Sequence, residues 1–239
     1  MSVVAPGTDV PKDVRDDVRG MFDRIAGRYD RANRIMSAGV DGLWRRKAIR
    51  ALLAGLGDSP RVLDLGAGTL DGAIAISRRK PGALVVGADF ARNMLAEGLK
   101  KPRAAKVAAQ VADGHELPYQ NAVFDAAFSA FCVRNLRDLE QAMKELRRVL
   151  RPSGRIAILE FFRPVRRRAF WDGFYNARVL PLLGHAVTGD RAAYRYLPES
   201  IARFVPRDEF ETILRKVGFA TVRGTDLFPA GVASLVVAE

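Results

Sequence analysis

The chain has 239 residues, of which 49 % are apolar and 28 % charged, and its 39 basic residues against 27 acidic ones give a net charge of +12. These proportions exclude a mainly disordered or collagen-like chain and fit one large globular domain or two small ones. A single cysteine, Cys132, and two histidines exclude an internal disulfide and a cysteine-based zinc site, so no metal is expected and a reducing cytoplasm is the expected compartment.

The amino-terminal quarter is expected to be helical. Residues 1–12 carry two prolines and a glycine and predict a flexible tail, and the opening Met1–Gly7 lacks the basic region of an export signal. From residue 13, apolar side chains recur at three- and four-residue steps, and a second helical run is expected over 42–53. Nowhere does the chain reach the ~18 consecutive apolar residues that a membrane span requires.

Strands and helices are expected to alternate beyond residue 60. The expected strands are 61–65, 83–89, 106–111, 124–130 and 155–161, and the expected helices are 71–79, 91–100 and 139–150. The last of these helices is expected to stop at Pro152-Ser153-Gly154. This rhythm predicts βαβ units and a parallel sheet with right-handed crossovers.

The carboxyl-terminal third combines a long insert with a hairpin. Residues 163–204 are rich in aromatic side chains and arginine, and residues 219–227 and 232–237 predict a closing antiparallel hairpin. We therefore expect residues 13–239 to form a single α/β domain in which 13–57 are a helical region and 163–204 an insert after the fifth strand.

A glycine loop follows the first expected strand and predicts a nucleoside site. Gly66 and Gly68 allow backbone amides to approach a ligand, and Asp89 at the end of the second strand can accept both ribose hydroxyls. The third glycine of a dinucleotide-binding loop is missing, because Asp71 stands there. The acid Asp64 would repel a pyrophosphate and suits a ligand with a positive end, such as the amino group of a methionine moiety.

The loop, its acids and the segment Ala112-Asp113-Gly114 resemble the class I S-adenosylmethionine (SAM) methyltransferases. The resemblance implies a Rossmann-like, mostly parallel seven-stranded sheet with helices on both faces, and SAM as the cofactor with S-adenosylhomocysteine as its product. It also implies that Asp113 and the Gly114 backbone bind the adenine edge, although a turn residue is the simpler interpretation of Asp113 alone. The residues expected to bind the cofactor are Tyr29, Asp64, Gly66, Gly68, Thr69, Asp89, Asp113, Gly114 and Ser129.

Longer segments are similar to the ubiquinone/menaquinone biosynthesis C-methyltransferase (UbiE/MenG) family. The similarity runs from about Phe22 to the carboxyl terminus and is carried by the following segments: Tyr29-Asp30 through Trp44, Phe131-Cys-Val-Arg134-Asn135, Arg148-Val-Leu-Arg-Pro-Ser-Gly154, Leu159-Glu160-Phe161, Tyr194-Arg-Tyr196-Leu197-Pro-Glu-Ser200 and Ala230-Gly231-Val232. It implies SAM-dependent C-methylation of a demethylated respiratory quinol, with demethylmenaquinol to menaquinol as the preferred reaction.

Several positions depart from the family pattern and keep other functions open. Asp41 stands in place of a histidine, Leu70 and Ser153 in place of glycines, and Phe162 in place of a small polar residue. The alternatives are a methyltransferase of the same fold acting on another phenolic, polyketide-like or small amine substrate, a basic RNA-binding protein or RNA methyltransferase, and a non-catalytic descendant.

Two residues after the fourth expected strand are the candidate catalytic groups. A hydroquinone carbon becomes nucleophilic when the neighbouring hydroxyl loses its proton, so the site needs a base or a cation that stabilises the phenolate. We expect Arg134 to stabilise the phenolate and Asn135 to orient the ring oxygen. The alternative for Arg134 is a surface salt bridge with Asp138 or Glu140.

Other residues are candidates for the cofactor pocket or the substrate side. Tyr29 is expected to cover the SAM pocket from a helical lid, unless it only packs between helices. Ser129 is expected to touch the methionine end of the cofactor, or to cap a turn. On the substrate side the candidates are Glu160, His185 and Tyr194, with a packed polar residue as the alternative for the last two.

The basic excess is spread over five clusters, which argues against a dedicated nucleic-acid groove. Residues 163–171 mix arginines with aromatic side chains, as an interfacial segment does. We therefore expect a transient contact with an anionic membrane surface, a peripheral position on the inner face of the membrane, and no nucleic-acid partner.

Overall fold

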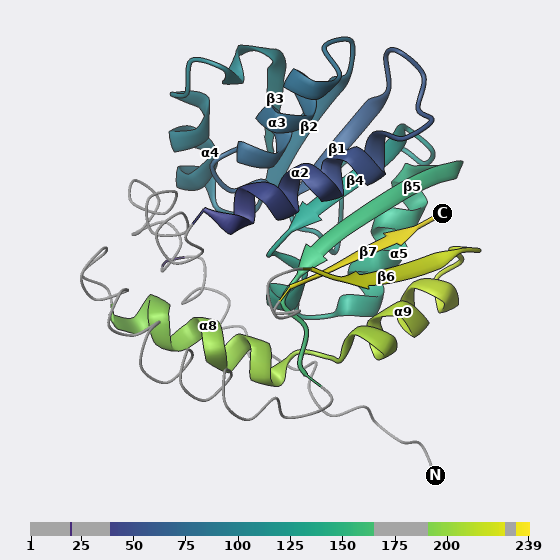
Figure 1. Cartoon of the computed structure of the whole chain (residues 1–239). Coiled ribbons are helices and arrows are strands. Elements are labelled where there is room, and N and C mark those ends of the chain that lie inside the picture. The colour runs from purple at the N-terminus through teal and green to yellow at the C-terminus, as the bar shows by residue number, and fades with distance from the viewer. Residues whose placement is uncertain (1–19, 21–38, 165–190, 228–232) are drawn as a thin grey trace.

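The computed structural model describes residues 20, 39–164, 191–227 and 233–239, which form a seven-stranded sheet flanked by helices (Figure 1). The strand order is β3-β2-β1-β4-β5-β7-β6. Neighbouring strands from β3 to β5 run parallel, whereas β7 pairs antiparallel with both β5 and β6. This is the sheet expected of a class I methyltransferase.

The elements follow each other along the chain as strand and helix in turn. The strands are β1 Arg61–Leu65, β2 Leu84–Asp89, β3 Val107–Val111, β4 Phe124–Ala130, β5 Leu150–Glu160, β6 Val222–Asp226 and β7 Ser234–Ala238. The helices are α2 Val40–Leu53, α3 Asp71–Arg79, α4 Arg92–Leu99, α5 Leu139–Val149, α8 Arg191–Arg203 and α9 Arg207–Lys216, with short 3-10 turns η1 Ala104–Lys106 and η2 Val133–Asn135.

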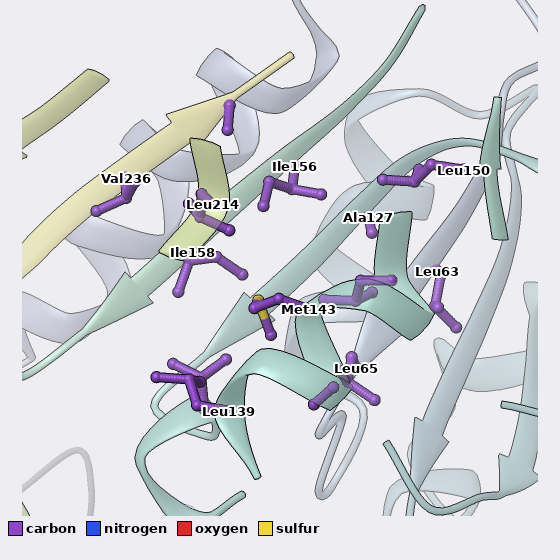
Figure 2. Close-up of a cluster of buried hydrophobic side chains, with 14 of the residues drawn as sticks. Leu63, Leu65, Ala127, Leu139, Met143, Leu150, Ile156, Ile158, Leu214 and Val236 are labelled. Carbon is purple, nitrogen blue, oxygen red and sulfur yellow. The ribbon is translucent and has the colours of Figure 1, made fainter. Parts of the chain in front are cut away.

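Helices cover both faces of the sheet. Successive strand side chains point to opposite faces, and apolar side chains occur on both. On one face, Leu63 and Ile158 pack with Met143 of α5 and Leu214 of α9 (Figure 2). On the other face, strand residues such as Phe128 pack with side chains of α2, α3 and α4. The central strands are therefore buried on both sides, and polar side chains find solvent or ligands only at their ends.

Most of the expected elements are confirmed, with two differences. The fifth strand was expected from residue 155, but β5 begins at Leu150 and includes Pro152-Ser153-Gly154, because Leu150 already pairs with Phe124 before a register shift in the ladder. Helix α9 was not expected at all, although Pro206 precedes it and acidic Asp208 and Glu209 occupy its first turn. The expected tail 1–12, the helical run before Gly39 except Gly20, and most of the insert lie outside the described residues.

The carboxyl ends of the parallel strands form one edge of the sheet, and α8 lies beyond the ends of β4 and β5 (Figure 1). Ligands of open parallel sheets bind at this edge. Among the described helices, none has both the length and the apolar character needed to cross a bilayer.

Candidate active site

The glycine loop joins the end of β1 to α3 in a conformation that the glycines make accessible. Gly66 and Gly68 have φ angles of 70° and 51°, in the left-handed region. The amides of Gly66 and Ala67 both donate to the Ala88 carbonyl of β2, at 2.8 and 3.1 Å. The loop is thus held against β2, with Thr69 buried behind it.

Asp64 places a buried carboxylate under this loop. Its side chain is 2 % exposed, and its Oδ2 has no hydrogen-bond partner among the residues that the structure describes. Burial raises the pKa of Asp64 to about 7, while the Arg45 guanidinium and the Ala73 amide of α3 lower it and Asp89 and Asp71 raise it further. A carboxylate in this state gains most from a ligand that brings a positive charge.

Asp89 fixes the loop from the end of β2. Its Oδ2 accepts the Gly68 amide at 2.7 Å, and its Oδ1 accepts the Ala91 amide at 2.8 Å. Both carboxylate oxygens of Asp89 thus accept backbone amides next to the glycine loop, which fixes the orientation of the carboxylate at this edge of the sheet. Asp89, which stands 21 positions after Gly68 in the sequence, thus contacts the Gly68 backbone directly.

Asp113 and Gly114 follow β3 at the same edge of the sheet. The Asp113 Oδ1 accepts the His115 amide at 2.9 Å and lies 2.5 Å from His115 Nδ1, while His115 Nε2 accepts the Asp138 amide at 3.1 Å. Asp113 therefore has the turn contacts of the simpler interpretation, and its side chain is still 49 % exposed. Its expected adenine contact stays a prediction.

Ser129 and Cys132 bring the end of β4 against the glycine loop. The Ser129 Oγ is buried and lies beside the Cys132 thiol. A Cβ on Gly66 would lie 2.1 Å from the Cys132 Sγ, so only glycine fits at position 66. Burial raises the pKa of the Cys132 thiol, which keeps it neutral.

Arg134 of η2 forms a buried ion pair with Glu160 at the end of β5. The Arg134 Nη1 donates to the Glu160 Oε1 and to the Phe131 carbonyl, each at 2.7 Å. Burial raises the pKa of Glu160, and Arg134 together with the amides of Phe161 and Arg134 opposes this. Neither alternative partner holds Arg134, because Asp138 caps α5 and Glu140 pairs with lysines.

Helix α8 contributes polar contacts that the sequence analysis did not single out. The Tyr196 hydroxyl donates to the Asn135 Oδ1 at 2.8 Å, and the Arg134 Nε donates to the Ser200 Oγ at 3.2 Å. Tyr196 and Ser200 belong to the segment that carried the family resemblance, yet only their spatial position reveals their partners. Both candidate catalytic residues are thus connected to α8.

Three expected site residues cannot be placed. Tyr29 and His185 lie outside the described residues, and for Tyr194 only the helix backbone is described. The described residues contain no group of three or more His, Cys, Asp or Glu side chains that could hold a metal ion.

The residues at this edge fit SAM. The Asp64 Oδ2, which has no partner in the described segments, suits a cationic end, and the positive φ angles of Gly66 and Gly68 open the loop backbone to a ligand. Asp89 places a carboxylate, the acceptor that ribose hydroxyls need, directly beside the loop. Asp64, Asp89 and the loop are therefore the part of the site that the structure brings together as expected.

Comparisons with known proteins give a consistent answer. The ubiE/COQ5 methyltransferase family matches residues 9–238. A ubiquinone/menaquinone biosynthesis C-methyltransferase UbiE from Geotalea uraniireducens is 37 % identical over 94 % of this chain and 96 % of its own length. A demethylmenaquinone methyltransferase from Thermus thermophilus is 43 % identical over 92 % of this chain and 99 % of its own.

Solved structures share the fold at low identity. A SAM-dependent methyltransferase from Thermotoga maritima superposes with a TM-score of 0.64 at 19 % identity, covering 92 % of this chain and 97 % of its own. A phosphoethanolamine N-methyltransferase from Haemonchus contortus, solved with S-adenosylhomocysteine, gives a TM-score of 0.63 at 16 % identity, covering 81 % of this chain and 51 % of its own.

Proposed function

Because the chain belongs to the ubiE/COQ5 methyltransferase family and is a SAM-dependent C-methyltransferase, we propose that its acceptor is a demethylated respiratory quinol, with demethylmenaquinol preferred. The observation that carries this choice is the 43 % identity, over 99 % of the relative's length, to a protein named demethylmenaquinone methyltransferase. Two of the positions that depart from the family pattern, Leu70 and Phe162, are buried in the core.

The residues proposed to bind the cofactor lie mostly at the carboxyl ends of the strands. When bound, SAM supplies an electrophilic methyl group carried on a sulfonium. In the proposal, Asp64 holds its positively charged end, Asp89 accepts the ribose hydroxyls, and Asp113 with Gly114 contacts the adenine. Thr69 and Ser129 complete the walls, and Tyr29 covers the pocket.

The residues proposed to act on the methyl acceptor belong to η2. A quinol hydroxyl must lose its proton for the neighbouring ring carbon to become nucleophilic, and a fixed cation stabilises the resulting phenolate. Arg134 supplies that charge, with its guanidinium oriented by Glu160, the Phe131 carbonyl and Ser200. Because the Asn135 Oδ1 accepts from Tyr196, its amide nitrogen is the group that would donate to a ring oxygen.

The remaining candidates take supporting roles in this proposal. Glu160 acts on the acceptor through Arg134, since its carboxylate is fully buried and occupied by Arg134 and two backbone amides. His185 and Tyr194 stay candidates for the substrate side.

We further propose that the enzyme reaches its prenylated acceptor by touching an anionic membrane surface. Helix α2 presents Leu43, Arg46, Lys47 and Arg50 on one exposed face, at the spacing of a helical stripe. Basic side chains near such a surface contribute about 1 kcal/mol each. The interfacial segment expected over 163–171 lies mostly outside the described residues.

The acceptor is tested with purified protein, labelled SAM and a panel of acceptors. We expect label in the product with reduced demethylmenaquinone, and less with a demethylated benzoquinol. Label only with an unrelated phenol or a small amine would contradict the proposal and favour another substrate for the same fold.

A further inference from the structure

Two half-buried phenylalanines form a stacked pair at the carboxyl ends of the central strands. Phe131 follows β4 and Phe161 follows β5, and their ring centroids lie 4.6 Å apart with 25° between the planes. Trp44 of α2 packs against both, at centroid distances of 6.5 and 6.2 Å. The pair is therefore an aromatic surface at the edge of the sheet where ligands bind.

The backbone of Phe131 is held in a conformation that phenylalanine seldom adopts. Its φ angle is 58°, in the left-handed region that favours glycine. Two hydrogen bonds maintain it, from the Phe131 amide to the Leu159 carbonyl at 2.8 Å and from the Arg134 Nη1 to the Phe131 carbonyl at 2.7 Å. Strained residues of this kind cluster at ligand sites, where the strain positions a side chain.

The stacked pair adjoins both halves of the site described above. Cys132, the residue after Phe131, packs directly against Gly66 of the cofactor loop. The Arg134 guanidinium carbon lies 5.9 Å from the centroid of the Phe161 ring. An aromatic ligand stacked on this pair would therefore sit between the cofactor loop and the cation proposed to stabilise its phenolate.

We propose that Phe131 and Phe161 form the platform on which the aromatic head of the acceptor stacks, which makes them specificity-determining residues. The inference rests on the proposed function, because it requires a planar aromatic acceptor. A fused two-ring head overlaps such a pair more fully than a single ring does. The opposing interpretation is that the pair only anchors α2 to the sheet through Trp44.

Trp44 offers a direct measurement, because the chain has two tryptophans and Trp171→Phe leaves Trp44 alone. Menadione, a naphthoquinone without a prenyl tail, quenches indole fluorescence when it lies close by. In the Trp171→Phe protein with S-adenosylhomocysteine present, we expect saturable quenching by menadione. Absence of saturable quenching would overturn the platform.

The variants test the two rings separately. Phe131→Leu and Phe161→Leu, each in the Trp171→Phe background, should weaken the apparent Kd for menadione about 3- to 10-fold, the usual contribution of one aromatic stack. Phe131→Gly suits the left-handed backbone and should weaken binding at least as much. Unchanged menadione affinity in folded variants of both residues would overturn the proposal.

Phe162 provides the matched control. It follows Phe161 in the chain but packs against Phe204 and Phe210, at 5.5 and 5.3 Å between centroids, and is 8 % exposed. Phe162→Leu should lower the thermal midpoint and leave menadione quenching unchanged. A loss of quenching equal to that of Phe161→Leu would show that general loosening of the core, and not the platform, explains the effect.

Kinetics separate this inference from the proposed function. If the unmodified protein methylates the quinol, Phe131→Leu should raise the KM for the quinol about 3- to 10-fold and leave the KM for SAM unchanged. An unchanged quinol KM would overturn the platform while the proposed function stands. If no quinol is methylated, the proposed function fails, and the quenching titration alone decides whether a naphthoquinone binds the pair.

Discussion

At the scale of single residues, the Arg134–Glu160 pair links the chemistry of the site to the stability of the fold. Both side chains are nearly inaccessible to solvent, at 6 and 0 % exposure. Removing one partner of a buried ion pair costs about 3–5 kcal/mol, because the other charge is left uncompensated. Replacing Arg134 is thus expected to lower both turnover and stability, and a second substitution is needed to separate the two effects.

We predict that Arg134→Ala lowers kcat at least tenfold, leaves SAM affinity nearly unchanged and lowers the thermal midpoint. Adding Glu160→Gln removes the uncompensated charge, so the double variant should regain part of the stability without regaining turnover. Calorimetric SAM binding, thermal unfolding and single-turnover assays measure the three quantities. Normal turnover in either variant would contradict the role of Arg134.

Asp64 predicts a pH dependence of cofactor binding. Its pKa of about 7 means that the carboxyl is largely protonated at pH 6 and ionised at pH 8 in the free protein. A cationic ligand prefers the ionised form, so SAM affinity should rise between pH 6 and 8 and level off above. Titration calorimetry in buffers of different ionisation enthalpy should detect proton release at pH 6 that Asp64→Asn abolishes.

The raised pKa of Asp64 also makes folding stability depend on pH, in the direction opposite to SAM affinity. Because burial raises the pKa of Asp64 to about 7 in the folded protein, above its pKa in the unfolded chain, the contribution of Asp64 to stability falls as pH rises from about 4 to 7. Asp64→Asn should flatten this part of the stability profile, as measured by urea unfolding at several pH values. An unchanged slope would show that the Asp64 pKa is not raised.

The residue scale also separates what the sequence could and could not predict. Asp64 and Asp89 could be predicted to share one edge of the sheet, because each stands at the carboxyl end of a parallel strand. The partner of Arg134 was sought nearby, at Asp138 and Glu140, whereas Glu160 is 26 positions away. Long-range pairing of this kind follows from the register of β4 and β5, which spacing alone does not give.

At the scale of elements, Leu70 shows how the loop and its neighbours fit together. It starts α3 with a φ of 65°, and its fully buried side chain fills a slot over Gly87 of β2 and Gly98 of α4. A Cβ on Gly87 would lie 2.5 Å from Leu70 Cδ2, and one on Gly98 would lie 2.7 Å from Leu70 Cγ. The apolar side chain therefore compensates for a backbone conformation that would favour glycine.

We predict that Leu70→Gly destabilises the protein by about 1–3 kcal/mol, because losing a buried leucine outweighs the relieved backbone strain. Gly87→Ala should also destabilise the wild type, yet cost less when Leu70 is already glycine. Urea unfolding of the two single variants and the double variant measures the coupling. Additive effects would show that the two residues do not share the slot.

The boundaries of elements were predictable where local signals agreed. Helix α3 has the expected bounds because the glycine loop and Asp71 mark its start, and strand β4 has the expected bounds because Phe124-Asp125 opens it. The start of β5 was misjudged, because Pro152-Ser153-Gly154 indicates a stop and only pairing with β4 extends the strand through it. Tertiary pairing overrode the local preference.

At the scale of the whole molecule, the net charge of +12 predicts salt-dependent binding to anionic vesicles. We expect cosedimentation with vesicles containing phosphatidylglycerol, loss of binding at 0.5 M salt (on the order of a 4 Å screening length), and little binding to neutral vesicles. Replacing Arg46, Lys47 and Arg50 together by glutamine should weaken binding more than replacing Arg78, Arg79 and Lys80. Equal losses would point to charge in general and not to the exposed face of α2.

The position of β7 has a consequence for how the chain is made. It is the last strand along this sequence, yet it lies between β5 and β6 and supplies hydrogen bonds to both. Until Ser234–Ala238 has been translated, β5 has an open edge with which no earlier described strand pairs. Translation products truncated before Ser234 should therefore pair with each other or with chaperones, and the acceptor-side end of β5, with Glu160, should become ordered only when Ser234–Ala238 has joined the sheet.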